Sequence, residues 1–232
     1  MTQDRLPKTI PLFPLPATVL FPKTYLPLHI FEPRYREMVE DALNDSAEAA
    51  RMIGMVLLKE NWGKDYYGNP PIHPIGCIGQ IMQVHRLNDG RYNLVLYGQD
   101  PFQVKKQFYD KSYRRAWIEP FPARPAGGRP AGEAVAALSD PLRSELVRSL
   151  QGYAQLRGWE NQITTLLEMR LDDERLVQLL SSELDTTPIE KQFLLESEDL
   201  AQQSRRLIDL IGFMTEEYRS RKEANRPWNI GD

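Results

Sequence analysis

The sequence predicts an α+β fold: a small β-barrel with one short helix, followed by an α-helical bundle with a long last helix. Two observations support this division. Up to about residue 121 the apolar residues come in short runs broken by proline and glycine, whereas after residue 139 they recur every three to four positions. We therefore expect a strand-rich subdomain over residues 1–122, a linker over 123–138 and a helical subdomain over 139–232.

The strand-rich part contains many short apolar runs. The Asp-Gly dipeptide at 89–90, between the runs 76–87 and 91–98, is typical of a β-hairpin. Seven prolines fall within the first 33 residues, and proline cannot donate to a strand ladder, so these strands should be edge strands, bulged or very short. Short strands at this spacing favour a closed or half-closed barrel. The other expected strands cover residues 10–15, 19–21, 25–30, 51–59, 102–109 and 114–121.

One helix is expected within the strand-rich part, over residues 33–44. Pro33 suits a first helical position, and Glu32 before it lies near the positive end of the helix dipole. Apolar residues then follow at helical spacing, so one face should pack onto the barrel. These residues are Tyr35, Met38, Val39 and Ala42.

The linker and the helices have their own signals. Seven of the fourteen residues in 120–133 are Pro or Gly, which excludes a helix or a central strand there. Asp140 is expected to cap a helix whose first turn contains Pro141, and Thr187-Pro188-Ile189-Glu190 is a capping box. The last helix is expected over about 198–223. The predicted buried stripes are Leu142, Leu146, Leu150 and Tyr153; Leu176, Leu179, Leu180 and Leu184; and Leu200, Leu207, Ile211, Met214 and Tyr218.

Composition narrows the function classes. Lys plus Arg number 29 against 32 Asp plus Glu, for a net charge of −3, so no overall positive field favours a nucleic acid partner. The N-terminal residues are polar and no apolar run is long enough to span a membrane, so we expect a cytoplasmic protein with no membrane partner. The single cysteine, Cys77, excludes an intrachain disulfide and a cysteine-based zinc site.

Motifs that carry catalysis are missing from the sequence. It contains no P-loop, no dinucleotide-binding glycine fingerprint, no nucleophile elbow and no His-Glu-x-x-His. His29, His73 and His85 lack the spacing of metal ligands, and Cys77 lies in an apolar run where a thiol is usually a small core residue. Asp172-Asp173 is typical of a helix cap. We therefore predict no catalytic residue, no cofactor and no metal, although an enzyme that uses Cys77 or the histidines is a competing hypothesis.

Two segments are candidates for binding. The turn-rich loop 61–71 carries Trp62, Tyr66 and Tyr67, and exposed loop aromatics often anchor partners, so these three are the candidate substrate-binding residues. The alternative is that they fold back onto the barrel. Basic residues with aromatic residues nearby occur over 105–117, which suggests RNA binding. However, Lys105 and Lys106 should point to opposite faces of a strand, which favours a solvated sheet face.

An ordered set of motifs resembles the N-terminal, substrate-binding domain of Lon protease. The resemblance implies a PUA-like barrel followed by a helical bundle, and a role in recognising protein substrates for an ATP-driven protease. It also implies that Leu28, Ile30 and Phe31 are core residues. The ATPase with its P-loop and the peptidase with its serine–lysine dyad have no counterpart here, so the chain looks like a stand-alone form. The motifs are IPLFPL (10–15), VLFP (19–22), LPLHIFEPRY (26–35), IGMV (53–56), GCIG (76–79), DGRYNL (89–94) and KQFLLE (191–196).

The leading functional hypothesis is a non-enzymatic protein that holds an unfolded or extended polypeptide in a groove between barrel and bundle. It would act as an adaptor or substrate receptor, with a protease or chaperone as a further partner. Pairing with a proline-containing edge strand is one physical mode. The alternative is an RNA-binding PUA-like protein. Because the last helix is long, we expect either a monomer or a homodimer.

Overall fold

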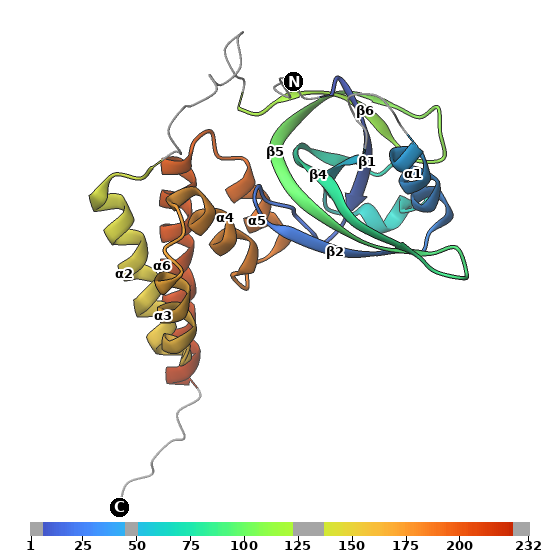
Figure 1. Ribbon diagram of the computed structural model, residues 1–232. Coiled ribbons are helices and arrows are strands. Elements are labelled where there is room, and N and C mark those ends of the chain that lie inside the picture. Colours follow the sequence, from blue (N-terminus) through green and yellow to red (C-terminus); the bar gives the residue numbers. More distant parts are fainter. Residues whose placement is uncertain (1–6, 45–50, 123–136, 225–232) are drawn as a thin grey trace, which may run out of the picture. The chain divides into compact units, whose positions relative to one another are not determined.

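The computed structural model describes residues 7–44, 51–122 and 137–224. They form an α+β structure with a six-stranded sheet and six α-helices, with one short 3₁₀ helix, η1 (Trp62–Asp65) (Figure 1). The strands are β1 (Thr9–Leu15), β2 (Tyr25–Ile30), β3 (Met52–Leu58), β4 (Ile72–Arg86), β5 (Tyr92–Phe108) and β6 (Arg115–Pro120). The helices are α1 (Pro33–Asn44), α2 (Asp140–Arg157), α3 (Glu160–Glu168), α4 (Asp173–Glu183), α5 (Pro188–Leu195) and α6 (Leu200–Ala224).

Most predicted elements are confirmed, with two differences in the strand-rich part. Residues 19–21, expected as a strand, form none, and β4 and β5 are longer than expected because the hairpin strands continue through bulges. Most of the predicted linker, 123–136, lies outside the described residues.

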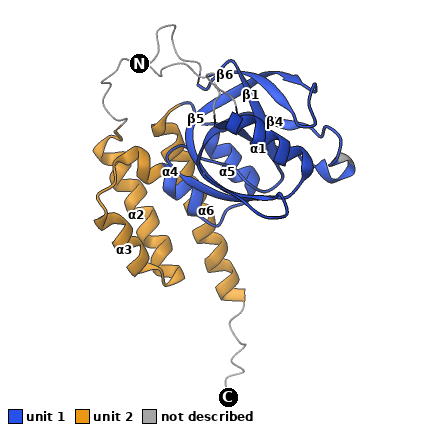
Figure 2. Cartoon of the chain, turned by 45° about the vertical axis from the view of Figure 1, so that its right-hand side comes forward, with its two compact units in different colours: residues 1–133, 178–198 blue, residues 134–177, 199–232 orange. Residues whose placement is uncertain are grey.

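The chain divides into two compact units, coloured in Figure 2. Unit 1 comprises residues 1–133 and 178–198, and unit 2 comprises residues 134–177 and 199–232. This division differs from the single boundary expected around 123–138, because residues 178–198 contact the strands. The Gln192 side chain donates from Nε2 to the carbonyl of Ile75 at 3.0 Å, and His73 Nδ1 lies 3.6 Å from Glu196 Oε1.

The strand pairings of unit 1 run in a closed circuit. The order across the sheet is β2-β5-β4-β3-β1-β6, and β6 also pairs with β5. β6 pairs antiparallel with β1 over Thr9–Pro11 and with β5 over Phe102–Phe108. Among the described residues, β1, β3, β4 and β6 therefore have two neighbours each and β5 has three, whereas β2 pairs with β5 alone.

The residues inside the circuit explain why it holds together. Inward-facing apolar side chains of the strands form a cluster from which water is excluded. Burying each such side chain contributes roughly 1.5–3 kcal/mol before conformational entropy is subtracted. The buried cluster consists of Ile10, Leu12, Val56, Leu58, Ile72, Ile78, Phe102, Ala116 and Ile118.

Helix α1 has the bounds and the buried face that its sequence predicts. Tyr35, Met38, Val39 and Ala42 are the buried residues of this helix. The carbonyl of Glu32 accepts from the amides of Tyr35 and Arg36, so the helix begins where Pro33 predicts.

The helix signals of the second half are also largely confirmed. Thr187 and Glu190 form the predicted capping box, with the Thr187 hydroxyl accepting from the Glu190 amide. In α2 the predicted stripe is buried, but the N-cap is Ser139 rather than Asp140, which is already helical. Asp172 Oδ1 accepts from the Arg175 amide as expected of a cap, whereas Asp173 instead accepts from the Leu138 amide and from Arg143.

Phe31 is not the core residue that the resemblance implied. It was predicted to be a core residue with Leu28 and Ile30, but its side chain is 61% exposed, whereas Ile30 is buried and Leu28 is half-buried. Phe31 follows the last residue of β2 and precedes α1, so the chain turns there and the strand alternation no longer directs the side chain inward.

Gly98 allows the close approach that positions β2. Its amide donates to the Thr24 carbonyl, and its carbonyl accepts from the Lys23 amide, just before β2 begins. A Cβ at this position would lie 1.9 Å from the carbonyl oxygen of Phe21, which is backbone and cannot move aside cheaply. Only glycine fits at this point.

We predict that Gly98→Ala lowers the free energy of unfolding by at least about 2 kcal/mol because the added methyl group overpacks against backbone. Urea unfolding followed by circular dichroism measures this. The matched control is Gly152→Ala in α2, where a Cβ meets nothing within 4 Å. That change should raise stability by about 0.5–1 kcal/mol through helix propensity. A neutral Gly98→Ala would contradict the close approach.

Candidate functional site

The outer face of the three-stranded segment β2–β5–β4 carries the larger of two candidate sites. The register places His29, Asn93 and His85 in one row across these strands, and Pro27, Val95 and Gln83 in the next. Side chains opposite each other on neighbouring strands share a face, so each row forms a continuous strip across the sheet.

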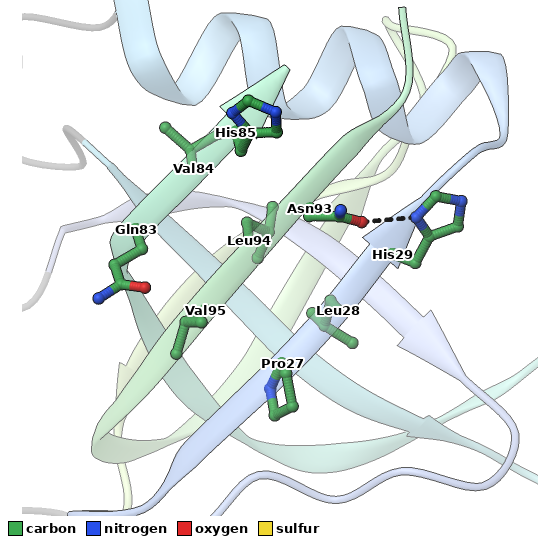
Figure 3. A pocket seen from close by; sticks show the side chains of 9 residues that line it. All are labelled: Pro27, Leu28, His29, Gln83, Val84, His85, Asn93, Leu94 and Val95. Atoms are coloured by element: carbon green, nitrogen blue, oxygen red, sulfur yellow. Dashed lines mark hydrogen bonds between the residues drawn. The ribbon is translucent and has the colours of Figure 1, made fainter. Parts of the chain in front are cut away.

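A shallow cavity of about 550 Å³ lies on this face, and we call it the outer groove (Figure 3). Its middle is apolar, with Pro27 and Val95, and Tyr25 and Tyr97 continue the apolar surface in the adjacent row, with ring centroids 5.0 Å apart. Tyr25 is 60% exposed. The residues that line the outer groove are Pro27, Leu28, His29, Gln83, Val84, His85, Asn93, Leu94 and Val95.

Polar side chains form one end of the outer groove. His29 Nδ1 lies 2.7 Å from Asn93 Oδ1, and Arg91 Nη1 lies 3.3 Å from His29 Nε2. Since the guanidinium can only donate, both contacts are satisfied by the neutral imidazole that carries its proton on Nδ1. Arg91 is itself held by the Asp89 carboxylate at 2.6 Å. These bonds fix the end of the outer groove and offer polar groups beside its apolar middle.

The open edge of β2 borders the outer groove. The Thr24 carbonyl accepts from the Gly98 amide of the strand β5. Backbone groups alternate sides along a strand, so Leu26, Leu28 and Ile30 also direct theirs toward β5, and Tyr25, Pro27 and His29 direct theirs away. This agrees with proline's tolerance on an edge strand, where its nitrogen faces away from the partner strand. The outward edge thus presents two N–H groups and three carbonyls.

A second cavity, of about 170 Å³, lies where three separate segments of unit 1 meet; we call it the tyrosine–arginine pocket. The first turn of α1 supplies Arg34, and the chain after η1 supplies Tyr67. The connection between β5 and β6 supplies Tyr109, Lys111, Ser112, Tyr113 and Arg114. The lining residues are Arg34, Tyr35, Tyr67, Gly68, Asn69, Tyr109, Lys111, Ser112, Tyr113 and Arg114.

Arg34 is the organising residue of this pocket. Its Nε donates to Glu32 Oε2 at 3.0 Å, and its guanidinium carbon lies 4.6 Å from the ring centroid of Tyr35 and 5.0 Å from that of Tyr66. Tyr67 is 5.9 Å away on the same measure. Burial alone would lower the pKa of Arg34, but Tyr35 and the Glu32 carboxylate outweigh it and raise the pKa. The guanidinium is therefore a permanent cation beside tyrosine rings.

The two buried tyrosine hydroxyls of this pocket, those of Tyr35 and Tyr113, stay protonated. Burial is the main cause that raises the pKa of Tyr35 and of Tyr113 far above the usual range, and for Tyr113 the nearby Asp41 carboxylate adds to it. Asp41 Oδ2 accepts from Lys111 Nζ and from the Tyr113 hydroxyl, each at 2.6 Å. Burial would raise the pKa of Asp41, but these two hydrogen bonds outweigh it and lower the pKa.

The three candidate residues of the aromatic loop have different environments. Trp62, in η1, is half-buried and packs against the buried cluster of unit 1, as the fold-back alternative predicts. Tyr66 is half-buried against the same cluster and its hydroxyl donates to Glu32 Oε1 at 2.6 Å. Tyr67 is 87% exposed and lines the tyrosine–arginine pocket. Tyr67 is thus the loop aromatic with an accessible ring.

The structure also shows where the other candidate residues of the sequence lie. Cys77 is fully buried in β4, and burial raises its pKa well above the usual value, so the thiol is a core group as expected. His29 and His85 line the outer groove, while His73 faces Glu196. Among the described residues, no three His, Cys, Asp or Glu side chains gather as metal ligands do, and no helix there is long and apolar enough to span a membrane.

The comparisons with known proteins agree with this architecture. The family model of the ATP-dependent protease La (LON) substrate-binding domain matches residues 9–212, and the chain belongs to that family. It is 26% identical over 220 residues to Lon protease 2 of Sorangium cellulosum, covering 94% of this chain and 26% of that protein. It is 23% identical over 211 residues to Lon protease of Anaeromyxobacter dehalogenans, covering 91% of this chain and 24% of that protein.

Two solved structures show the same fold. The N-terminal domain of the Mycobacterium avium complex Lon protease matches with a TM-score of 0.63 at 20% identity, covering 88% of this chain and 98% of that one. The Lon N-terminal domain protein from Xanthomonas campestris matches with a TM-score of 0.58 at 22% identity and the same coverage. The chain thus spans about a quarter or less of the curated relatives' length, but nearly all of these two solved chains.

Sequence reasoning missed both sites as assembled surfaces. Val95, Asn93 and Gln83 gave no local signal, because only the strand register aligns them with Pro27. Arg34 was visible only as part of a family motif. An arginine at the start of a helix and tyrosines in a later loop do not indicate a binding site in the sequence, because only the fold brings these segments together.

We predict that Trp62→Ala lowers the free energy of unfolding by about 1–3 kcal/mol, because it leaves a gap against the core cluster. Tyr67→Ala should change it by less than about 0.5 kcal/mol, because the ring is exposed. Urea unfolding of both variants measures the difference. Equal losses in the two variants would contradict the placement of this loop.

Proposed function

We propose that this protein is a non-enzymatic recognition module that binds unfolded or extended polypeptide along the outer groove and the open edge of β2. The observation that carries the proposal is the coincidence of these two features. β2, within the described residues, is the one strand of the sheet with a single neighbour, and the apolar strip of Pro27 and Val95 runs beside its free backbone groups. An extended chain needs both backbone partners and places for alternate side chains.

Membership in the LON substrate-binding family supports this proposal, because that family is the substrate-binding domain of an ATP-dependent protease. By this account the protein acts as an adaptor or substrate receptor in the cytoplasm and works with a protease or chaperone. The groove expected between the barrel and the bundle stays a prediction, since the outer groove lies within unit 1.

We also infer that unit 1 is the PUA-like barrel implied by the resemblance. The closed circuit of β5, β4, β3, β1 and β6 supports this inference, because a sheet whose first and last strands pair has the connectivity of a barrel. The helical bundle is supported by the contacts of α2 with α6 and with α3. It is also supported by the buried face of α2, which consists of Leu142, Leu146, Leu150, Tyr153 and Ala154.

The residues of the two sites support binding rather than catalysis. In the outer groove His29 is held by Asn93 and Arg91, and outside both sites Cys77 is a fully buried thiol with a raised pKa. Neither has the arrangement of a nucleophile with an adjacent base.

We predict that Val95→Asp weakens the binding of an unfolded polypeptide by about tenfold or more, because a carboxylate placed in the apolar middle must be desolvated. Fluorescence anisotropy with a labelled short peptide of Val, Thr and Ser measures this. Met169→Asp, at an exposed apolar position after α3, is the matched control and should bind like the wild type. Equal affinities of the two variants would place binding elsewhere.

The backbone mode makes a separate prediction. The same peptide with alternate amides N-methylated should bind about tenfold or more weakly, because it can no longer donate to the outward carbonyls of β2. Methylating the other alternate set should have a smaller effect, since those amides face away from β2. If neither set matters, pairing with the edge strand is wrong.

RNA binding is the second candidate, favoured by a specific observation. The tyrosine–arginine pocket brings Tyr109, Lys111 and Arg114 of the basic–aromatic stretch next to Tyr67 of the aromatic loop. Such binding would combine stacking with phosphate contacts and weaken steeply as salt rises. Absence of binding to single-stranded RNA at low salt would exclude it.

A further inference from the structure

The tyrosine–arginine pocket has a chemical character that the outer groove lacks. Among the described residues that line it, three are cations and none is acidic; four tyrosines, a serine and an asparagine supply the other polar groups. The nearby carboxylates of Glu32 and Asp41 hold Arg34 and Lys111 in place without lining the cavity. The lining therefore favours a negatively charged group that accepts hydrogen bonds.

The pocket also has a buried base and an open rim. Tyr35, Tyr113 and Arg114 are nearly fully buried, whereas Tyr67 and Tyr109 are exposed. A ligand therefore enters between exposed tyrosine rings and meets cationic groups in a water-poor setting, where hydrogen bonds to a charged group are stronger than at the surface.

The hydrogen bonds of Arg34 leave it able to bind a ligand. Nε and Nη2 contact the Glu32 carboxylate, and Nη1 and Nη2 lie 3.4 Å from the carbonyl oxygen of Tyr66, a long contact. These bonds use four of the five N–H donors of the guanidinium and leave one on Nη1. That donor can give one charge-assisted hydrogen bond to a ligand carboxylate.

Size and charge select the class of ligand. A cavity of about 150 Å³ accommodates a benzene-sized molecule, so the 170 Å³ of this pocket suits a carboxylate with its adjoining carbons but not a whole nucleotide. Arg34 and Lys111 each already face one carboxylate. The remaining field is moderate, which suits a singly charged carboxylate better than a doubly charged phosphate.

We propose that the tyrosine–arginine pocket binds a carboxylate of the recognised polypeptide, either its C-terminal group or an Asp or Glu side chain. This inference rests on the proposed function and adds a preference to it. The outer groove gives affinity for extended chain of many sequences, and the pocket selects chains that present a carboxylate.

The test uses a short extended peptide of Val, Thr and Ser in matched forms. One pair differs by a C-terminal acid or amide, and a second pair, amidated, differs by one internal Glu or Gln. At least one acidic form should bind the full-length protein about tenfold or more tightly than its neutral partner, the magnitude of a charge-assisted hydrogen bond. The pair that shows the gap identifies the source of the carboxylate.

Variants assign that preference to the pocket. Lys111→Gln and Arg34→Gln should remove most of the gap between acidic and neutral peptides, and Arg34→Lys should restore part of it. Lys105→Gln removes the same charge from β5 outside the pocket, where Lys105 pairs with Glu119, and should keep the whole gap. Because Arg34 also supports the Glu32 and Tyr66 contacts, Lys111→Gln keeps the test valid if Arg34→Gln unfolds.

The outcomes are distinguishable. Neutral and acidic peptides that bind wild type equally would overturn the carboxylate pocket and leave the proposed function standing. Failure of every peptide to bind would overturn both. Binding of a labelled single-stranded RNA that is lost in Lys111→Gln, without any preference for peptide carboxylates, would assign the pocket to nucleic acid instead.

Discussion

The pairing of β6 with both β1 and β5 is the constraint on which the rest of unit 1 depends. It closes a circuit of five strands, each of which pairs with two others of the circuit. β2 is added to β5 outside this circuit and keeps one open side. Because unpaired backbone groups on a sheet edge attract another strand, the open side is either a hazard or a binding site. Pro27 shortens the run of donors on that edge, which limits self-pairing without covering it.

The two candidate sites both belong to unit 1 but offer different chemistry. The outer groove combines an apolar strip with free backbone groups, which are common to every polypeptide and therefore not selective. The tyrosine–arginine pocket offers cations and hydroxyls, which distinguish one chain from another by charge. A receptor for diverse unfolded chains requires unselective affinity for any chain together with one selective contact.

Local patterns predicted the elements well, for physical reasons. The buried face of α1 and the capping box at Thr187 depend on residues within one or two helical turns, so the sequence alone defines them. The prediction that Phe31 is a core residue was wrong, because Phe31 lies where strand alternation ends and the chain turns into α1. Residues 178–198 join unit 1 because of contacts such as Gln192 with Ile75, and a helical period shows that a face is buried but not what covers it.

The two sites depend on non-local geometry, and so the sequence did not predict them. The row of Pro27, Val95 and Gln83 exists only because the pairing of β2 and of β4 with β5 sets these three residues opposite one another. The tyrosine–arginine pocket joins Arg34, Tyr67 and Tyr113, which no sequence period relates. Sequence reasoning marked the aromatic loop as a binding candidate, and Tyr67 is the one of its three aromatics that lines this pocket.

Residue-resolved amide hydrogen exchange by NMR, with and without a bound unfolded polypeptide, tests the central claim most directly. The account predicts that the outward amides of Tyr25 and His29 exchange fast in the free protein and become protected on binding. The Leu28 amide, which faces β5, should be slow in both states. Protection confined to other segments, with Tyr25 and His29 unchanged, would contradict a polypeptide site at the edge of β2.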